Sequence, residues 1–497
     1  MKDLIFILSN GASSLTLTHS PDGWDDTLVR YERSTKYWGL FRSFTVQLKF
    51  VKEGATYLRN EFYTNGVSAL VTCQIKRLNK ITLEYYTAYT AEVDFATFKD
   101  EDHTVSVNLV EGGLSKLIKN KAGTEYVISE EEWDGSFQFG TYVYNDVVYW
   151  QLINVFSMLV EKITDGEFGV KSNFLSSKEN VFVIAKYFDT TSFDSFVKTS
   201  LDDFFKSINA AFCLGMGIEI IEGVETLVIE PVEYFFDTEN ITHFSSINDF
   251  RLSVLDDLHF NSIKIGFPEQ TYGDDTEYSG GEKEANTYSI FTTPILNITK
   301  EIDLTSKYRG DITGILEFSE KNEPVQIEDN FLITLMVHPT IPGKFYFHKG
   351  LIRKKDSIFE YDFYNVELSP RRLLNNHKEF IESCLNCQGS DVIFTAGGNK
   401  QHLNETKGLD WIEEYTGFTL AAPSIFLPYA FEITVPLAPG DFNSIVGGES
   451  LGVITFDYQG NTYKGYILDI KVKLAGRGEV EFKLLASYDN DLTTLIR

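Results

Sequence analysis

The chain has 497 residues, of which 43% are hydrophobic, 14% aromatic and 23% charged. Its formal net charge is -28, from 72 acidic and 44 basic residues, which argues against binding to nucleic acid or to an anionic membrane surface. At about 100–200 residues per domain, this length predicts three or four domains, and we place four.

The first predicted domain, residues 1–128, is a β domain. Phe44–Phe50 and Val105–Leu109 alternate apolar and polar side chains, which places one face of each strand in a core. Leu83–Phe95 is rich in aromatic residues, and these suit pleated, half-buried surfaces. The apolar run Leu4–Leu8 is too short for a secretory signal, so we expect synthesis in the cytoplasm.

The second predicted domain, residues 129–235, mixes helices with a hairpin. A helix is predicted from about Val148 to Ile163, and Asp165-Gly166 is typical of a helix C-terminus. The best helical pattern is Leu201–Leu214, with Ser200 as N-cap and Asp203 three residues later.

The glycines that follow, Gly215 and Gly217, are predicted to end this second helix. Two strands come next, Ile218–Ile221 and Thr226–Ile229, joined at Glu222-Gly223. The helix and hairpin together are expected to pack one apolar stripe on a sheet.

The third predicted domain, residues 236–387, returns to strands, such as Phe331–Val337. It contains an acidic, glycine-rich loop at 268–284, whose composition is too polar for a core. A closing helix is predicted from Pro370, preceded by Ser369 as N-cap, to about Cys384.

The fourth predicted domain, residues 388–497, begins with a short helical candidate at Leu409–Tyr415 and ends in a β-meander. The meander strands are Phe431–Val435, Val453–Tyr458, Thr462–Leu474 and Val480–Leu485. The predicted fold class is therefore mainly β with a few helices (α+β), in several β-sandwich or barrel-like domains. No exact internal repeat is visible in the sequence.

Catalytic motifs are absent from the sequence. Glu131, Glu132 and Asp134 form one run of like charge, and nothing places two of them across a substrate as a glycosidase requires. The eight histidines are dispersed, and there is no GxSxG elbow, phosphate-binding loop or calcium loop. No catalytic or cofactor-binding residue is predicted.

The four cysteines, Cys73, Cys213, Cys384 and Cys387, are too sparse for a disulfide framework and fit a reducing compartment. Cys384 and Cys387 form a single CxxC. A structural zinc site needs a second pair or two histidines nearby, and only His402 follows. Reduced, partly buried thiols without a metal are predicted.

Several short segments resemble the tail or baseplate proteins encoded by phages and prophages of Bacteroidota. They are Gly23-Trp24-Asp25-Asp26, Tyr37–Phe41, Gly54–Asn60, Tyr308–Asp311, Asn365–Leu374 and Phe426–Glu432. The helix-plus-hairpin at 200–230 with its flanking β domains is also similar to the hub proteins of phage tails. The resemblance implies a structural protein of the virion tail tip or baseplate hub, without cofactor or catalytic residues. Its implied partners are copies of itself in a ring and other tail proteins.

Two other functions stay open at this stage. A receptor- or glycan-binding module would use exposed aromatic side chains, and the first to consider are Trp24, Trp38, Trp133, Trp150 and Trp411. A cell-wall-cleaving enzyme is the third hypothesis, for which the sequence offers no preferred carboxylate.

Overall fold

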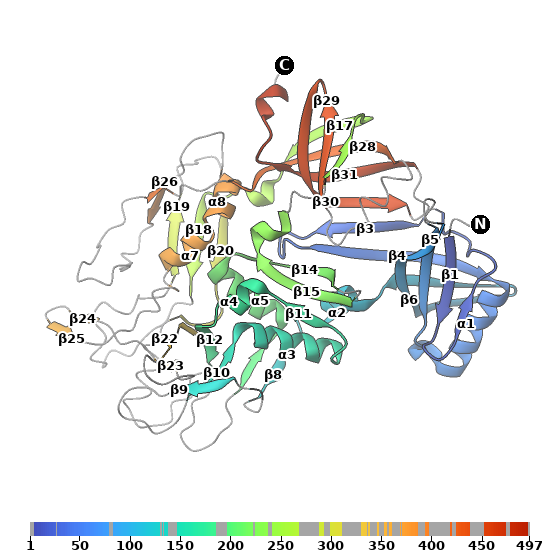
Figure 1. Ribbon diagram of the computed structural model, residues 1–497, viewed down its shortest axis with the longest axis horizontal. Helices are drawn as coiled ribbons and strands as arrows, with labels where there is room; N and C mark the ends of the chain where they lie inside the picture. Colours follow the sequence, from blue (N-terminus) through green and yellow to red (C-terminus); the bar gives the residue numbers. More distant parts are fainter. Residues whose placement is uncertain are drawn as a thin grey trace.

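The fold is mainly β with several sheets, as the sequence predicts (Figure 1). In this computed structural model, the described residues are 4–25, 27–78, 83–129, 132, 134–137, 147–184, 196–221, 224–236, 241–267, 288–292, 299–310, 330–334, 336–337, 345–346, 352–354, 357–359, 368, 370–385, 393–396, 418–419, 424–437, 452–473 and 478–495. Among these residues, no helix combines the length and hydrophobicity that crossing a bilayer requires.

The N-terminal half of a 13-stranded sheet encloses its own core. Its strands are β1 (Leu4–Ser9), β2 (Ser14–Thr16), β4 (Leu40–Val51), β5 (Thr72–Leu78), β6 (Tyr85–Glu101) and β7 (Thr104–Glu111). Helix α1 (Lys52–Asn65) and the 3-10 helix η1 (Gly66–Ser68) connect β4 to β5. Alternate residues of the strands are buried, such as Leu48 and Phe50 in β4, and Leu58 of α1 packs against them.

The C-terminal half of the same sheet encloses a second core. Its strands are β3 (Leu28–Arg33), β16 (Ile241–Phe244), β17 (Asp249–Val254), β28 (Phe426–Leu437), β29 (Val453–Tyr458), β30 (Asn461–Lys473) and β31 (Gly478–Ser487), and the 3-10 helix η6 (Leu492–Leu495) follows. Strand β3 pairs with both β4 and β30, so it joins the two halves. The predicted meander strands are confirmed.

The two halves repeat one strand order. In the first half β4 pairs with β7, β7 with β6 and β6 with β5. In the second half β28 pairs with β31, β31 with β30 and β30 with β29. One more strand extends each unit: β1 lies antiparallel beside β5, and β16 lies parallel beside β29. The duplication is therefore one of topology, which no exact sequence repeat reveals.

A third core lies among helices in the middle of the chain (Figure 1). The helices are α2 (Gly113–Lys121), α3 (Leu152–Thr164), α4 (Asn173–Ser177), α5 (Leu201–Phe212), α7 (Pro370–Asn376) and α8 (Lys378–Leu385). Helices α2 to α5 contact a sheet of β11 (Gly169–Lys171), β15 (Val224–Pro231) and β14 (Leu214–Ile221), which the 3-10 helix η3 (Val232–Phe236) follows. Helix α7 packs on α5, and α8 packs on β28.

Smaller sheets complete the described part of the chain. One pairs β8 (Tyr126–Ile128) with β13 (Val197–Thr199), and another contains β9 (Gly135–Phe137), β10 (Val147–Gln151), β12 (Val181–Ile184) and β21 (Phe331–Thr334). A third contains β18 (Ser262–Gly266), β19 (Tyr288–Thr292), β20 (Glu301–Thr305), β26 (Ile393–Ala396) and β27 (Phe418–Thr419). In one further pair of strands β22 (Met336–Val337) lies beside β23 (Phe345–Tyr346), and in another β24 (Ile352–Lys354) lies beside β25 (Ser357–Phe359). A 3-10 helix, η4 (Asp256–Leu258), precedes β18.

The predicted second helix is confirmed as α5, together with its start. Ser200 is the N-cap, and its side chain accepts a hydrogen bond from the backbone N–H of Asp203 at 3.1 Å. The first predicted helix begins later than expected, at Leu152, because Val147–Gln151 forms strand β10. Its predicted C-terminus is confirmed, since Asp165 adopts the left-handed conformation there.

The prediction that Gly215 and Gly217 end helix α5 is wrong. Cys213 ends the helix in the left-handed conformation, and both glycines lie inside β14. They are needed for close packing: a Cβ on Gly215 would lie 2.5 Å from the Phe235 ring, and one on Gly217 would lie 3.1 Å from the Cα of Gly39. The glycines therefore allow the segment around Gly39 to lie close beside β14, where Trp38 and Met216 form a parallel bridge.

The predicted closing helix is two helices, α7 and α8, with His377 between them. Its Nε2 donates to the Ala210 carbonyl at 3.1 Å, which fixes the junction against α5. The acidic loop 268–284, the helical candidate Leu409–Tyr415 and the N-cap Ser369 lie outside the described residues.

The division into four domains stays a prediction. Sheet hydrogen bonds cross its boundaries, because β3 of the first region pairs with β30 of the last. Strands β16 and β17 of the third region likewise pair with β29 and β28.

Arg33 at the end of β3 ties three distant segments together. Its guanidinium donates to the carbonyl oxygens of Ile467 at 3.0 Å, Trp38 at 2.6 Å and Phe235 at 2.7 Å. The side chain is buried and lies over the Phe236 ring, and burial lowers the pKa of Arg33 to about 10. One side chain thus links β30, the segment around Trp38 and η3.

Candidate functional site

The acidic run considered for catalysis serves local structure. Glu132 accepts hydrogen bonds from Lys162 Nζ at 2.9 Å and from the backbone N–H of Ser129 at 2.8 Å. Burial alone would raise the pKa of Glu132, but these hydrogen bonds lower it below its ordinary value. Asp134 accepts from the backbone N–H of Gln151 at 2.6 Å. Glu131 lies outside the described residues.

The cysteines are buried where the structure describes them. Cys73, Cys213 and Cys384 carry free thiols. Burial raises the pKa of Cys73 to about 12 and also raises the pKa of Cys213 and of Cys384 well above the ordinary thiol value. Such thiols have little nucleophilic character. Cys387 lies outside the described residues, within which no group of three or more metal-ligating side chains is found.

The tryptophans that the structure describes do not form an exposed platform. Trp38 and Trp150 are buried in the central core. Trp24 is half-buried and packs edge-on against Phe6. Trp133 and Trp411 lie outside the described residues, so the glycan-binding hypothesis gains no support from the three that are placed.

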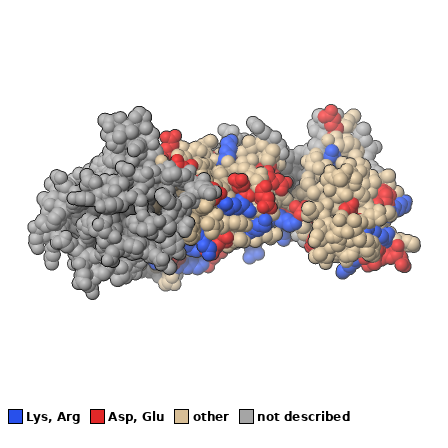
Figure 2. Space-filling model, turned by 90° about the horizontal axis from the view of Figure 1, so that it is seen from below, with Lys and Arg blue, Asp and Glu red and all other residues tan. Residues whose placement is uncertain are grey.

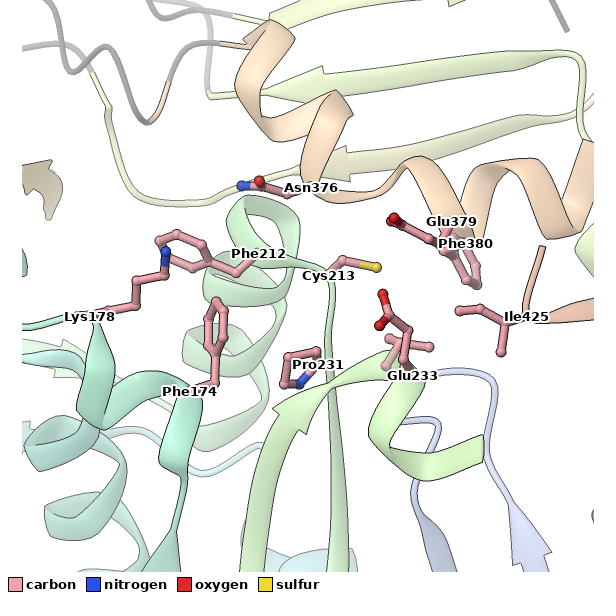
Figure 3. A pocket seen from close by; sticks show the side chains of 11 residues that line it. Phe174, Lys178, Phe212, Cys213, Pro231, Glu233, Asn376, Glu379, Phe380 and Ile425 are labelled. Carbon is pink, nitrogen blue, oxygen red and sulfur yellow. The ribbon is translucent and has the colours of Figure 1, made fainter. Parts of the chain in front are cut away.

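A pocket of about 230 Å³ lies where α4, the end of α5, η3 and α8 meet (Figure 3). Glu230 of β15 sets one wall, because its carboxylate accepts from the backbone N–H groups of Asn173 and Phe174 at 2.6 and 3.1 Å. This contact holds α4, which carries Phe174 and is followed by Lys178, against the sheet. Ser383 of α8 fixes another wall, since its hydroxyl oxygen accepts from the backbone N–H of Ile425 at 2.6 Å.

Charged side chains of opposite sign line different walls of this pocket. Lys178 stands beside the Phe174 and Phe212 rings on one side, and the carboxylates of Glu233 and Glu379 lie across from it, near the Cys213 side chain (Figure 3). Burial and then the charge of Glu379 raise the pKa of Glu233.

No pattern in the sequence predicts this pocket. Its charged residues come from the C-cap of α4, from η3 and from α8, which are separated by many tens of residues in the chain. Only the tertiary packing of those elements brings them together.

The ends of the 13-stranded sheet form a second candidate surface. Among the described strands, β17 pairs only with β28 and β2 pairs only with β1. Strand β17 also exposes apolar side chains, since Leu252 is 39% and Val254 60% exposed. Further exposed apolar side chains lie in the last turn of α1, in η1 and just after it, namely Tyr63, Val67 and Leu70. Open strand edges and exposed apolar side chains are features of protein–protein contact surfaces.

Surface charge is mixed on the face shown in Figure 2, where basic and acidic side chains alternate over the described surface. Ion pairs such as Lys198–Glu125 at 2.8 Å and Lys116–Glu92 occur among the described residues. The described part of this face therefore lacks the continuous basic track typical of nucleic-acid binding.

Comparison with solved structures finds phage tail proteins. The 43 kDa tail protein of prophage MuSo2 from Shewanella oneidensis has 9% identity and a TM-score of 0.40, over 97% of this chain and 98% of that chain. The tail protein from Neisseria meningitidis MC58 has 8% identity and a TM-score of 0.39, over 97% of both chains. Prophage tail protein gp18 from Listeria monocytogenes EGD-e has 10% identity and a TM-score of 0.37, over 99% of this chain and 97% of that chain.

At these identities and TM-scores, the similarities establish neither a shared fold nor a shared function. No protein-family model matches the sequence, and no curated protein matches it.

Proposed function

We propose that this chain is a structural protein of a phage tail, of the kind carried by phages and prophages of Bacteroidota. It acts at the tail tip or baseplate hub, as a ring of copies that assembles with other tail proteins. We assign it no catalytic role and no cofactor. In this proposal the chain is made in the host cytoplasm and ends in the virion tail.

The observation that carries the proposal is the duplicated strand order within one hydrogen-bonded sheet. Two units of the same topology stand next to each other, joined through β3. The main path of paired strands runs from the edge strand β17 to the edge strand β2, and β16 is a further edge strand beside β29. Resemblance of the Trp24, Tyr37–Phe41 and Phe426–Glu432 segments to tail proteins adds independent support.

A contact between two different ends of identical chains is heterologous, and it closes into a ring when the rotation between copies allows. In the proposed ring the β17 edge of one copy meets the opposite end of the next copy. The exposed side chains of Leu252 and Val254 become buried in that contact, which supplies an apolar contribution to association.

The test is the oligomeric state of the purified chain by sedimentation velocity, with two matched variants. Val254→Lys places a charge on the β17 edge and is expected to shift the ring toward monomer. Val224→Lys is the control, because Val224 is similarly exposed, at 52%, but lies in β15, outside the 13-stranded sheet. A wild-type chain that sediments as a monomer at every concentration contradicts the ring, and equal effects of both variants contradict the β17 contact.

A further inference from the structure

The pocket between α4, η3 and α8 carries a positive charge on one wall, and no anionic partner for it lies among the described residues. Lys178 Nζ lies 5.1 Å from the centre of the Phe174 ring and 5.5 Å from that of Phe212. These two rings hold the ammonium group in place by cation–π attraction. Within the described part of the chain, no carboxylate forms an ion pair with Lys178.

The facing wall carries two negative charges. Glu379 is 3.4 Å from Lys378 Nζ, its neighbour in α8. Glu233 in η3 forms neither an ion pair nor a hydrogen bond with any described residue, and it is close enough to Glu379 for their like charges to repel. A cation placed between them would relieve this repulsion.

Apolar side chains also line the pocket. They are Phe212, Phe380 and Ile425, together with Pro231 and Val232. Asn376 at the rim is already engaged through its Nδ2, which donates to the Ala211 carbonyl at 2.8 Å. The pocket therefore combines charged walls of opposite sign with apolar side chains in its lining.

We propose that this pocket binds a small zwitterion, whose carboxylate pairs with Lys178 and whose ammonium group pairs with Glu233 and Glu379. The ligand class is an amino acid or a short ω-amino carboxylate. A volume of about 230 Å³ is below the roughly 300–1,000 Å³ of pockets for drug-sized ligands, so the ligand is small. Ring assembly through β17 does not use these side chains, so this proposal and the proposed function fail independently.

The experiment is isothermal titration calorimetry of the full chain with glycine, 4-aminobutyrate, 6-aminohexanoate, leucine and lysine. These probes vary the separation of the two charges and the apolar part between them. Lys178→Met and Glu233→Gln each remove one charge from the pocket. Each is expected to lower the affinity for the tightest-binding probe about ten-fold or more. Glu179→Gln is the matched control, because Glu179 is exposed next to Lys178 and does not line the pocket.

A second variant separates binding from folding. The double variant Lys178→Glu with Glu233→Lys keeps both charges and reverses their positions. A zwitterion is therefore expected to bind the double variant in the opposite orientation, and more tightly than it binds either of the two single variants. Failure of every probe to bind the wild-type chain overturns the proposal. Binding that Lys178→Met and Glu233→Gln leave unchanged overturns it as well.

Discussion

Replacing Arg33 by methionine is expected to loosen three segments at once. Arg33 Nε and Nη1 donate hydrogen bonds to carbonyl oxygens in β30, at Trp38 and in η3. A methionine side chain has a similar volume but no hydrogen-bond donor. The buried carbonyl groups of Ile467, Trp38 and Phe235 therefore lose the hydrogen bonds that they accept from the guanidinium.

The magnitude follows from the number of acceptors. Each buried carbonyl left unsatisfied costs about 1–3 kcal/mol. The variant also avoids burying a guanidinium, and this gain offsets part of the loss. We expect a net loss of about 3 kcal/mol, which is a large fraction of the roughly 5–15 kcal/mol that stabilises a typical domain.

Hydrogen exchange measured by mass spectrometry resolves this loss by segment. Since about 1.4 kcal/mol corresponds to a factor of ten, protection should fall about 100-fold in peptides covering β3, η3 and β30 together. Arg251→Met is the control, because the Arg251 side chain is 76% exposed and its ion pair with Glu432 is on the surface.

Two results would refute this reasoning. One is a fall in protection of less than about ten-fold in all three segments. Such a fall corresponds to less than about 1.4 kcal/mol, well below the expected loss of about 3 kcal/mol. The other is faster exchange confined to β3, which would mean that Arg33 does not link the segments.

Three more predictions concern stability and are checked by thermal and urea unfolding. Gly39→Ala should destabilise strongly, because its Cβ would lie 2.2 Å from the Met216 carbonyl oxygen, whereas Gly169→Ala, with open space around it, should not. Ser200→Ala should cost about 1 kcal/mol through loss of the α5 N-cap, and an unchanged midpoint would contradict this. Burial lowers the pKa of His377 to about 4, so the unfolded chain binds a proton between about pH 6.5 and 4 that the folded chain does not. Its contribution of about 3 kcal/mol should therefore be complete above pH 6.5 and be lost toward pH 4. His377→Gln should remove that part of the pH dependence.

Local features of this fold follow from local sequence. The meander strands β29 and β30 come within one residue of their predicted bounds, because alternation directly reports a half-buried strand. Helix α5 was predictable from its apolar spacing and from the Ser200 cap. Strand β10 was not separable from helix α3, since the run Val147–Trp150 is apolar on both faces and periodicity does not distinguish the two.

Long-range features did not follow from the sequence. The pairing of β3 with β30 joins residues more than 400 positions apart, and no local pattern encodes it. The role of Gly217 was not predictable, because a glycine after a helix usually ends it, whereas here the close approach of the Phe235 ring and of Gly39 requires the glycine. In the sequence, Lys178 and Glu233 look like ordinary surface residues. Only the packing of α4 and η3 brings them into one pocket.

Electron microscopy of isolated virions that carry a labelled copy of this chain tests the central claim most directly. The account predicts label in a ring at the tail tip or baseplate, with density for several copies joined edge to edge. Intact tails without the label, together with a purified chain that stays monomeric, would contradict it.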